Sequence, residues 1–312
     1  MFKFQFTIAL SVMFLWTPHV RAQNDSAATK IQAPEISGLL KTRWEYCFED
    51  NTGRFDIRNA RVKLGGKLSR HVAYGLQMDY STHGKLSQYQ NMYANRSFVA
   101  KFVNPDSRDL GMQLDYKIPR IPLTAHAGVY NGAGINNPQW QKSPFVLSRL
   151  VYGTMEGFRA GLKYYGGKTP AGDRIANYGF DLRYAGDRYA VETEYVVKDS
   201  VNTGAYLSAA YLQGSYRFPV NGKMAKYITP TLRGDAMGYD FFDRGFDVSR
   251  LTLGLNMGLG TKQMDTEIRF NYEYFVRKNE SGIRDDPYYA AYFERTDKGM
   301  FDKFTVEFLI KF

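Results

Sequence analysis

Apolar and polar residues alternate with a period of two along most of this 312-residue chain. In segment 264–278, one face carries Ile268, Phe270, Tyr272, Tyr274 and Val276, and the other carries Glu267, Arg269, Asn271 and Glu273. Because successive side chains of a β-strand point to opposite faces, this period predicts strands with one apolar face. Each such segment spans about ten residues, the length that a tilted strand needs to cross a bilayer. No segment shows a convincing helical period.

Two architectures accommodate strands with one apolar face. In a soluble sandwich the apolar faces meet in a core, whereas in a membrane barrel they contact lipid and the polar faces line a lumen. Aromatic residues stand at the ends of many apolar faces, as Tyr178 and Tyr184 do. Since amphipathic rings settle at lipid headgroups, this placement favours the barrel. The 24 Tyr, 22 Phe and 29 Gly of the chain agree with it.

Turn signals divide the chain into about fourteen strands, with sixteen as the alternative. These strands are expected near 36–48, 55–68, 72–82, 109–118, 121–131, 145–153, 157–165, 175–185, 188–198, 205–217, 225–238, 247–260, 264–278 and 301–312. Short turns near 69–71, 119–120, 154–156, 186–187, 219–224 and 260–263 alternate with longer loops at 49–54, 83–108, 132–144, 166–174, 199–204, 239–246 and 279–300. With a periplasmic N-terminus, all short turns lie on the periplasmic side, as in outer-membrane barrels. The sequence therefore predicts an all-β, transmembrane, antiparallel up-and-down β-barrel.

The first 22 residues resemble a secretory leader. Lys3 precedes an apolar run from Phe4 to Trp16, and Val20-Arg21-Ala22 suits a signal peptidase. An uncleaved anchor is the alternative, but the run is shorter than the ~20 residues that a spanning helix needs. We expect a signal peptide at 1–22, a flexible mature N-terminus at 23–35 and the barrel at 36–312. The predicted location is the outer membrane of a Gram-negative-type cell.

Charge and the rest of the chain limit the function further. No second long apolar run follows the leader, and the mean hydropathy is −0.42. The formal net charge of +10 implies anionic partners, although no nucleic-acid module accompanies it. The last strand ends in Phe312 and alternates Phe304, Val306, Phe308 and Ile310 with polar residues. Such an end predicts recognition by barrel-assembly machinery, and an ordinary closing strand of a soluble fold is the alternative.

Two stretches resemble the phosphate-selective porin O/P family of outer-membrane porins. The first comprises Ile36-Ser37-Gly38, residues 55–64 and residues 72–80; the second comprises Arg96-Ser97-Phe98-Val99, Pro105 and residues 108–114 and 127–136. The resemblance implies a porin barrel and a homotrimer as a candidate assembly. Family members place a further strand pair before the Arg-Ser-Phe element, where this chain has only the short polar segment 81–95. The family barrel has ~16 strands, so this chain resembles a version lacking one hairpin.

A porin selects solutes through the charges on its inner wall, which act strongly in low-dielectric surroundings. The basic residues predicted to line the pore are Lys41, Arg43, Arg58, Arg61, Lys63, Arg96, Lys101, Lys117, Arg149, Arg159, Lys163, Arg183, Arg217 and Arg269. Acids that share these faces are Glu45, Asp79, Asp181, Glu192, Glu194 and Glu273. We therefore predict passive diffusion of small hydrophilic solutes, anionic or neutral, with a modest preference for anions such as phosphate. Loop 83–108 is the best candidate for a constriction, with an external flap as the alternative, and loop 279–300 is expected at the surface.

Two other functional classes stay open. One is a closed structural or adhesion barrel without a conducting pore. The other is an outer-membrane hydrolase, for which His71, His83 and His126 are the available imidazoles of the mature chain. No serine or carboxylate motif frames them, so we expect no catalytic residue. No spacing of metal ligands or phosphate-binding loop predicts a metal or cofactor, and the single Cys47 excludes an intramolecular disulfide.

Overall fold

The computed structural model describes residues 35–67, 73–79, 97–99, 111–131, 143–168, 172–200, 205–220, 222, 225–259, 265–278 and 300–311. Its strands are β1 (Glu35–Cys47), β2 (Thr52–Lys67), β3 (Ala73–Asp79), β4 (Gly111–Lys117), β5 (Leu123–Tyr130), β6 (Phe145–Gly153), β7 (Gly157–Lys168), β8 (Arg174–Ala185), β9 (Tyr189–Ser200), β10 (Ala205–Tyr216), β11 (Phe218–Pro219), β12 (Tyr227–Tyr239), β13 (Val248–Gly258), β14 (Asp265–Arg277) and β15 (Lys303–Lys311). One short helix, α1 (Phe241–Arg244), follows β12. No helix within the described part of the chain has the length and apolar character to span a membrane.

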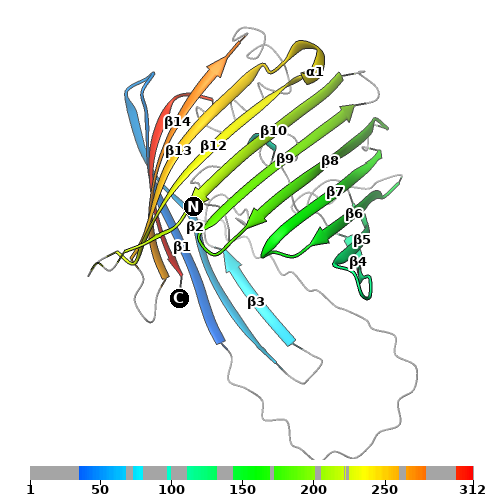
Figure 1. The fold of residues 1–312 in the computed structure, drawn as a ribbon, viewed down its shortest axis with the longest axis horizontal. Helices are drawn as coiled ribbons and strands as arrows, with labels where there is room; N and C mark the ends of the chain where they lie inside the picture. The colour runs from blue at the N-terminus through cyan, green and yellow to red at the C-terminus, as the bar shows by residue number, and fades with distance from the viewer. Residues whose placement is uncertain are drawn as a thin grey trace, which may run out of the picture.

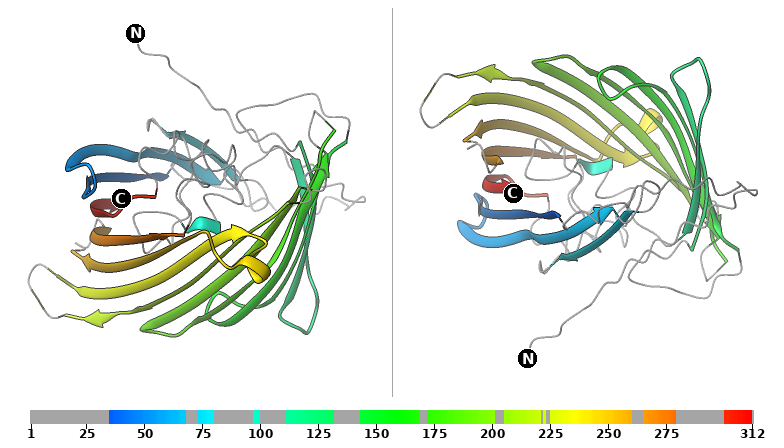
Figure 2. Two further views of the ribbon diagram at one scale, coloured as in Figure 1. Left: turned by 90° about the horizontal axis from the view of Figure 1, so that it is seen from above. Right: turned by 90° about the horizontal axis from the view of Figure 1, so that it is seen from below.

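The strands form one antiparallel sheet that curves around an interior (Figures 1 and 2). Its order is β3-β2-β1-β15-β14-β13-β12-β10-β9-β8-β7-β6-β5-β4, and β11 pairs only with β12. Apart from β3 and β4, strands of this path that are consecutive in the chain are neighbours, and the first and last strands of the chain pair through Leu39–Cys47 and Lys303–Lys311. The path has fourteen strands, as the turn signals predict. The sheet is open between β3 and β4. Most of the connection between these two strands lies outside the described residues, and this is also where the porin O/P family has its additional hairpin.

Burial decides between the two architectures that the sequence allows. Along β13, Leu251, Leu253 and Leu255 are exposed on the outer face, whereas Thr252 and Asn256 are buried on the inner face. A sandwich would pack the apolar face against a second sheet, but this single sheet leaves it outward. Such a large exposed apolar band fits contact with acyl chains rather than with water. The fold is a transmembrane-type antiparallel β-barrel wall, with its polar faces turned inward.

Aromatic side chains gather near both ends of the outer face. Near the short turns, Tyr184 stacks on Tyr189 with ring centroids 5.6 Å apart. At the opposite end, Tyr46 of β1 packs against Phe48 with ring centroids 5.2 Å apart, and Phe242 of α1 lies 5.6 Å from Tyr195. Amphipathic and aromatic rings at both ends of a spanning strand are typical of membrane interfaces. The sequence indicates the strand-end tyrosines, but it does not predict α1.

The first hairpin differs from the prediction. A longer loop is expected at 49–54, but β1 ends at Cys47 and β2 begins at Thr52, so the connection is a tight turn. Asn51 makes it possible because it adopts a positive φ of 50° and accepts a hydrogen bond from the Tyr46 hydroxyl at 3.1 Å. Asparagine tolerates this left-handed conformation better than most residues. The polar composition of 49–54 indicates a break in the strand but not the length of the connection.

A β-bulge interrupts the pairing of β1 with β2. Lys41 faces Asn59 and Thr42 faces Ile57, so Arg58 is the extra residue. Because the bulge shifts the alternation by one residue, Asp56 and Arg61 both face inward. The predicted signal peptide and mature N-terminus lie outside the described residues.

Candidate functional site: the charged inner wall

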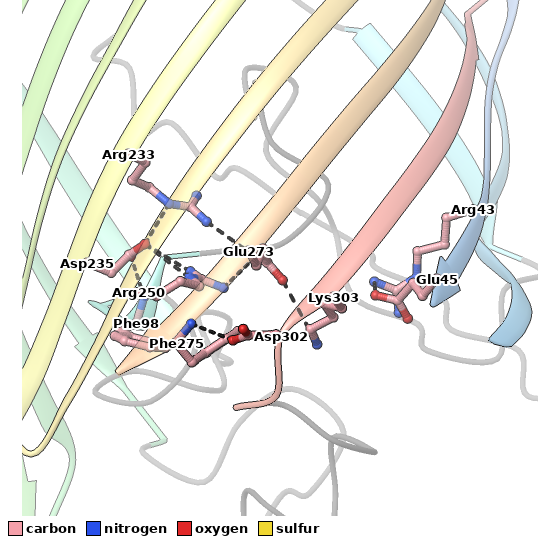
Figure 3. A network of polar contacts seen from close by, with 10 residues as sticks. All are labelled: Arg43, Glu45, Phe98, Arg233, Asp235, Arg250, Glu273, Phe275, Asp302 and Lys303. Carbon is pink, nitrogen blue, oxygen red and sulfur yellow. Dashed lines mark hydrogen bonds and ion pairs between the residues drawn. The ribbon is translucent and has the colours of Figure 1, made fainter. Parts of the chain in front are cut away.

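A buried ion-pair network crosses the inner faces of four strands (Figure 3). Asp235 of β12 accepts hydrogen bonds from Arg233 at 2.8 Å and from Arg250 of β13 at 3.2 and 3.1 Å. Arg250 also donates to Glu273 of β14 at 2.7 Å, and Lys303 of β15 lies 4.0 Å from Glu273. Their side chains are nearly fully buried. The strand register places Asp235 opposite Arg250 and Glu273 opposite Lys303, and Arg250 reaches Glu273 diagonally.

Three residues from the long connection between β3 and β4 pack on this network. The backbone N–H of Phe98 donates to Asp235 Oδ1 at 3.0 Å, and the Arg250 guanidinium lies 4.8 Å from the centre of the Phe98 ring. Phe98 is fully buried in a cluster that includes Met237, Phe275 and Met300. Figure 2 shows this segment inside the curve of the sheet. Ser97–Val99 therefore lies inside the barrel, although the rest of loop 83–108 is outside the described residues.

A second set of ion pairs continues onto β1 and β2. Arg43 donates to Asp56 at 2.9 Å and lies 3.1 Å from Glu45, whose other oxygen accepts from Arg54 at 2.8 Å. Figure 3 places Arg43 and Glu45 next to Lys303 on the same inner face. This part of the wall thus carries two arginines and two carboxylates in mutual contact. Such close pairing neutralises most of their field in the lumen.

Nearer the short-turn end, a third group joins β14, β15 and β1. Arg269 donates to Glu267 at 2.6 Å and to the fully buried Glu307 at 3.1 Å, and Lys41 lies 4.0 Å from Glu307. Tyr227 of β12 donates to Glu267 at 3.2 Å. Both predicted basic residues of this group, Lys41 and Arg269, are therefore engaged with carboxylates.

The wall formed by β6–β9 is less neutral and less covered. Asp181 of β8 accepts hydrogen bonds from Arg149 of β6 at 2.9 Å and from Arg159 of β7 at 3.2 Å. Lys163 pairs with Glu194 of β9. The side chains of Arg149 and Arg159 keep 36% and 18% of their surface exposed, in contrast to the buried arginines of the first network. These guanidinium groups are therefore within reach of solutes in the lumen.

Of the three histidines that the sequence offers to a hydrolase, His71 and His83 lie outside the described residues, and His126 lies at the edge of this region. His126 of β5 faces inward, and its Nδ1 lies 2.7 Å from Asp115 Oδ1 of β4. Gln113 donates to the same carboxylate oxygen at 2.6 Å, and Tyr130 donates to Gln113 at 2.7 Å. The group holds an imidazole and a carboxylate, but it brings no serine or cysteine to them among the described residues. In that part of the chain there is also no group of three side chains suited to a metal ion.

The predicted basic residues divide into three sets by position. Inward positions on the described strands are taken by Lys41, Arg43, Arg61, Lys63, Lys117, Arg149, Arg159, Lys163, Arg183 and Arg269. Arg217 lies between β10 and β11, with its guanidinium 4.5 Å from the centre of the Tyr227 ring. The side chains of Arg58, Arg96 and Lys101, and also Phe312, lie outside the described residues.

Sequence reasoning missed the central charges of the wall. Arg233, Asp235, Arg250, Lys303 and Glu307 were not among the predicted basic residues or the acids facing them, yet they form the buried networks. The signal was present, because each occupies a position between two outward residues of a predicted strand. Their contact with a segment more than a hundred residues distant along the chain carries no local signal.

Comparisons with known proteins agree with this fold. No protein-family model matches the sequence, and neither does any curated protein. Among solved structures, a trimeric form of the outer membrane protein OmpT of Vibrio cholerae is 11% identical, with a TM-score of 0.56 over 90% of this chain and 100% of that chain. The outer membrane channel DcaP of Acinetobacter baumannii is 10% identical, with a TM-score of 0.56 over 89% and 96%. The anion-selective porin from Comamonas acidovorans is 11% identical, with a TM-score of 0.53 over 89% and 98%. The structural neighbours are thus outer-membrane β-barrels of the porin type.

Proposed function

We propose that this chain is an outer-membrane porin through which small hydrophilic solutes diffuse passively. The observation that carries the proposal is the burial pattern of the sheet. Apolar residues are exposed on its outer face, and charged residues line the inner faces of β1, β12–β15 and β6–β9. A barrel that needed only to be a stable scaffold would not require so many charges inside, since burying each one is costly. An inner wall of charges is how a pore sets solute entry. Porin and channel neighbours support the same reading.

The inserted segment is proposed to narrow this pore. Ser97–Val99 packs on the inner face of β12–β14 and is held there by a buried carboxylate and a guanidinium. Together with the networks behind it, the segment occupies lumen that solutes would otherwise cross. We therefore expect a conductance smaller than that of an unobstructed barrel with the same number of strands.

A modest preference for anions, phosphate included, is the second part of the proposal. It rests on the accessible arginines of β6 and β7, because the charges of β12–β15 are buried and paired. The resemblance to phosphate-selective porins, homotrimer assembly and recognition of Phe312 by the assembly machinery are extensions of this proposal. So is export through cleavage after Ala22, which N-terminal sequencing of outer-membrane material would reveal as a chain starting at Gln23.

A closed barrel without a conducting pore is the competing candidate. It is favoured by the complete burial of Glu273 and Glu307 and by the dense pairing around Arg250. Reconstitution of the purified full chain in a planar bilayer separates the two. A porin gives discrete conductance steps in KCl. In a KCl gradient, a porin that prefers anions gives a reversal potential shifted toward the equilibrium potential of chloride. The absence of conductance steps would favour the closed barrel, and a cation-selective reversal potential would contradict the anion preference.

A further inference from the structure

One residue of the inner wall belongs to the type whose charge changes near neutral pH. His126 of β5 faces inward, keeps 22% of its side-chain surface exposed, and is the single histidine of the described residues. Imidazole is the side-chain group that ordinarily gains or loses a proton between pH 5 and 8. Guanidinium, ammonium and carboxylate groups ordinarily keep their charge in this range. The wall at β5 therefore carries a charge that the pH of the solution can set.

A chain of hydrogen bonds holds this imidazole in one orientation. Tyr130 donates to Gln113 at 2.7 Å, and Gln113 donates to Asp115 Oδ1 at 2.6 Å. His126 Nδ1 lies 2.7 Å from the same oxygen. Because an ionised carboxylate only accepts hydrogen bonds, Nδ1 carries the proton of the neutral ring. Nε2, which has no hydrogen-bond partner among the described residues, is therefore the nitrogen that binds the second proton.

The strands on either side of β5 present charges of opposite sign to His126. Asp115 of β4 and Arg149 of β6 lie opposite it in the strand pairing. Lys117 takes the next inward position on β4, and Lys163 of β7 lies opposite Arg149. Arg149 and Lys163 already pair with carboxylates of β8 and β9. The group that responds to a proton on His126 is therefore the remaining acid, Asp115.

Asp115 depends on His126 for its countercharge. The Asp115 side chain keeps 56% of its surface exposed. In the described part of the chain, the imidazole is the one ionisable group within ion-pair distance of this carboxylate. A neutral imidazole leaves the negative charge of Asp115 in the lumen, whereas an imidazolium cancels it. One proton on Nε2 thus changes the local charge of the wall from negative to neutral.

We propose that His126 is the residue that makes the ion preference of the pore depend on pH. The inference rests on the proposed pore, because ion preference is a property of permeation. With His126 protonated, the pair of Asp115 and His126 is neutral, and anions are preferred more strongly than with the neutral ring. A unit charge about 5 Å from an ion in water changes the free energy of that ion by about RT, which corresponds to about a 3-fold change in its local concentration. Potassium is affected in the opposite sense, and salt screening weakens both effects.

The test measures reversal potentials of the full chain in planar bilayers, in a KCl gradient with the same pH on both sides. We expect the chloride-to-potassium permeability ratio of the wild type to be about 3-fold higher at pH 5.5 than at pH 8. His126→Gln should keep the low ratio at both pH values, and His126→Arg should keep the high ratio at both. Asp115→Asn removes the negative charge without a proton, so it should raise the ratio at pH 8 to the value of the wild type at pH 5.5.

The matched control replaces both His71 and His83 by glutamine. These are the other histidines of the mature chain, and they lie outside the described residues. This double variant should keep the full change of the wild type between pH 5.5 and pH 8. Circular dichroism of each variant checks that the β-sheet content matches that of the wild type.

Each outcome decides one claim. A pH-dependent ratio that is lost in both His126 variants and kept in the control supports the role of His126. A wild-type ratio that is the same at both pH values overturns this role while the pore stands. So does a change that persists in His126→Gln or disappears in the control, or an Asp115→Asn ratio at pH 8 equal to that of the wild type. A folded wild type that carries no current at either pH overturns the proposed pore itself.

Discussion

Replacing Asp235 by alanine should release the inserted segment from the wall. The Asp235 side chain is fully buried, accepts from Arg233 and Arg250, and also holds the Phe98 N–H at 3.0 Å. Removal of one partner from a buried ion pair leaves an uncompensated charge and costs about 3–5 kcal/mol. Glu273 remains beside Arg250 and offsets part of this cost, so we expect the lower end of the range.

The consequence for the pore distinguishes this variant from a general loss of stability. Without Asp235, Phe98 loses its backbone acceptor, and the Arg250 guanidinium beside its ring keeps Glu273 but loses its two hydrogen bonds to Asp235. The segment should then leave the wall for part of the time, which predicts larger and noisier conductance steps in planar bilayers. Glu307→Ala is the control, because it breaks a buried pair with Arg269 on the same wall without touching Phe98.

Unfolding and conductance are measured on both variants. We expect both to unfold at lower denaturant concentration than the wild type, but only Asp235→Ala to change the size and noise of the conductance steps. Steps identical to the wild type in Asp235→Ala, or an equal change in Glu307→Ala, would refute the idea that Asp235 holds the segment in the pore.

Three further predictions concern other parts of the wall. Phe98→Ala, which keeps every ion pair, should lower the free energy of unfolding by about 3–5 kcal/mol and increase conductance noise as Asp235→Ala does; unchanged noise would show that the ring does not anchor the segment. Leu253→Arg, on the exposed outer face of β13, should cost about 2–4 kcal/mol in lipid vesicles, whereas Leu253→Ala should cost less, and equal costs would place residue 253 away from the lipid core. Asn51→Val should destabilise the first hairpin by about 1–2 kcal/mol, because valine rarely adopts the positive φ of residue 51, whereas Asn51→Gly should be tolerated in the same denaturant titration. A valine that is tolerated would contradict the tight turn and support the longer loop that the sequence predicts.

The sequence predicts the fold well because the alternation is a local property of each strand. Where Leu251, Leu253 and Leu255 alternate with Arg250 and Thr252, the period alone gives both the strand and its faces. The short length of the turn at 48–51 is not predictable from composition, because it depends on the left-handed conformation of Asn51. Helix α1 is not predicted from the sequence, because four residues are too few to show a helical period.

The site was predictable only in part. Inward positions of Arg149, Arg159 and Lys163 follow from the strand period, but their partners depend on register across three strands. Likewise, loop 83–108 is recognisable as a candidate constriction from its length and its mixture of aromatic and basic residues. That Phe98 would contact Asp235 follows from three-dimensional packing between segments 137 positions apart, which no local pattern encodes.

The most direct test of the whole account asks which solvent each face of a strand meets. Single cysteines are placed at Leu162 and Lys163 of β7 and at Leu212 and Gln213 of β10, in a chain whose Cys47 is replaced by serine, and the protein is reconstituted in vesicles. We expect a fluorophore at 162 or 212 to be quenched by a quencher carried on lipid acyl chains, and 163 and 213 to react with a water-soluble thiol reagent. Neighbouring positions that respond alike, with 162 and 212 as reactive in water as 163 and 213, would contradict the outward apolar face on which the account rests.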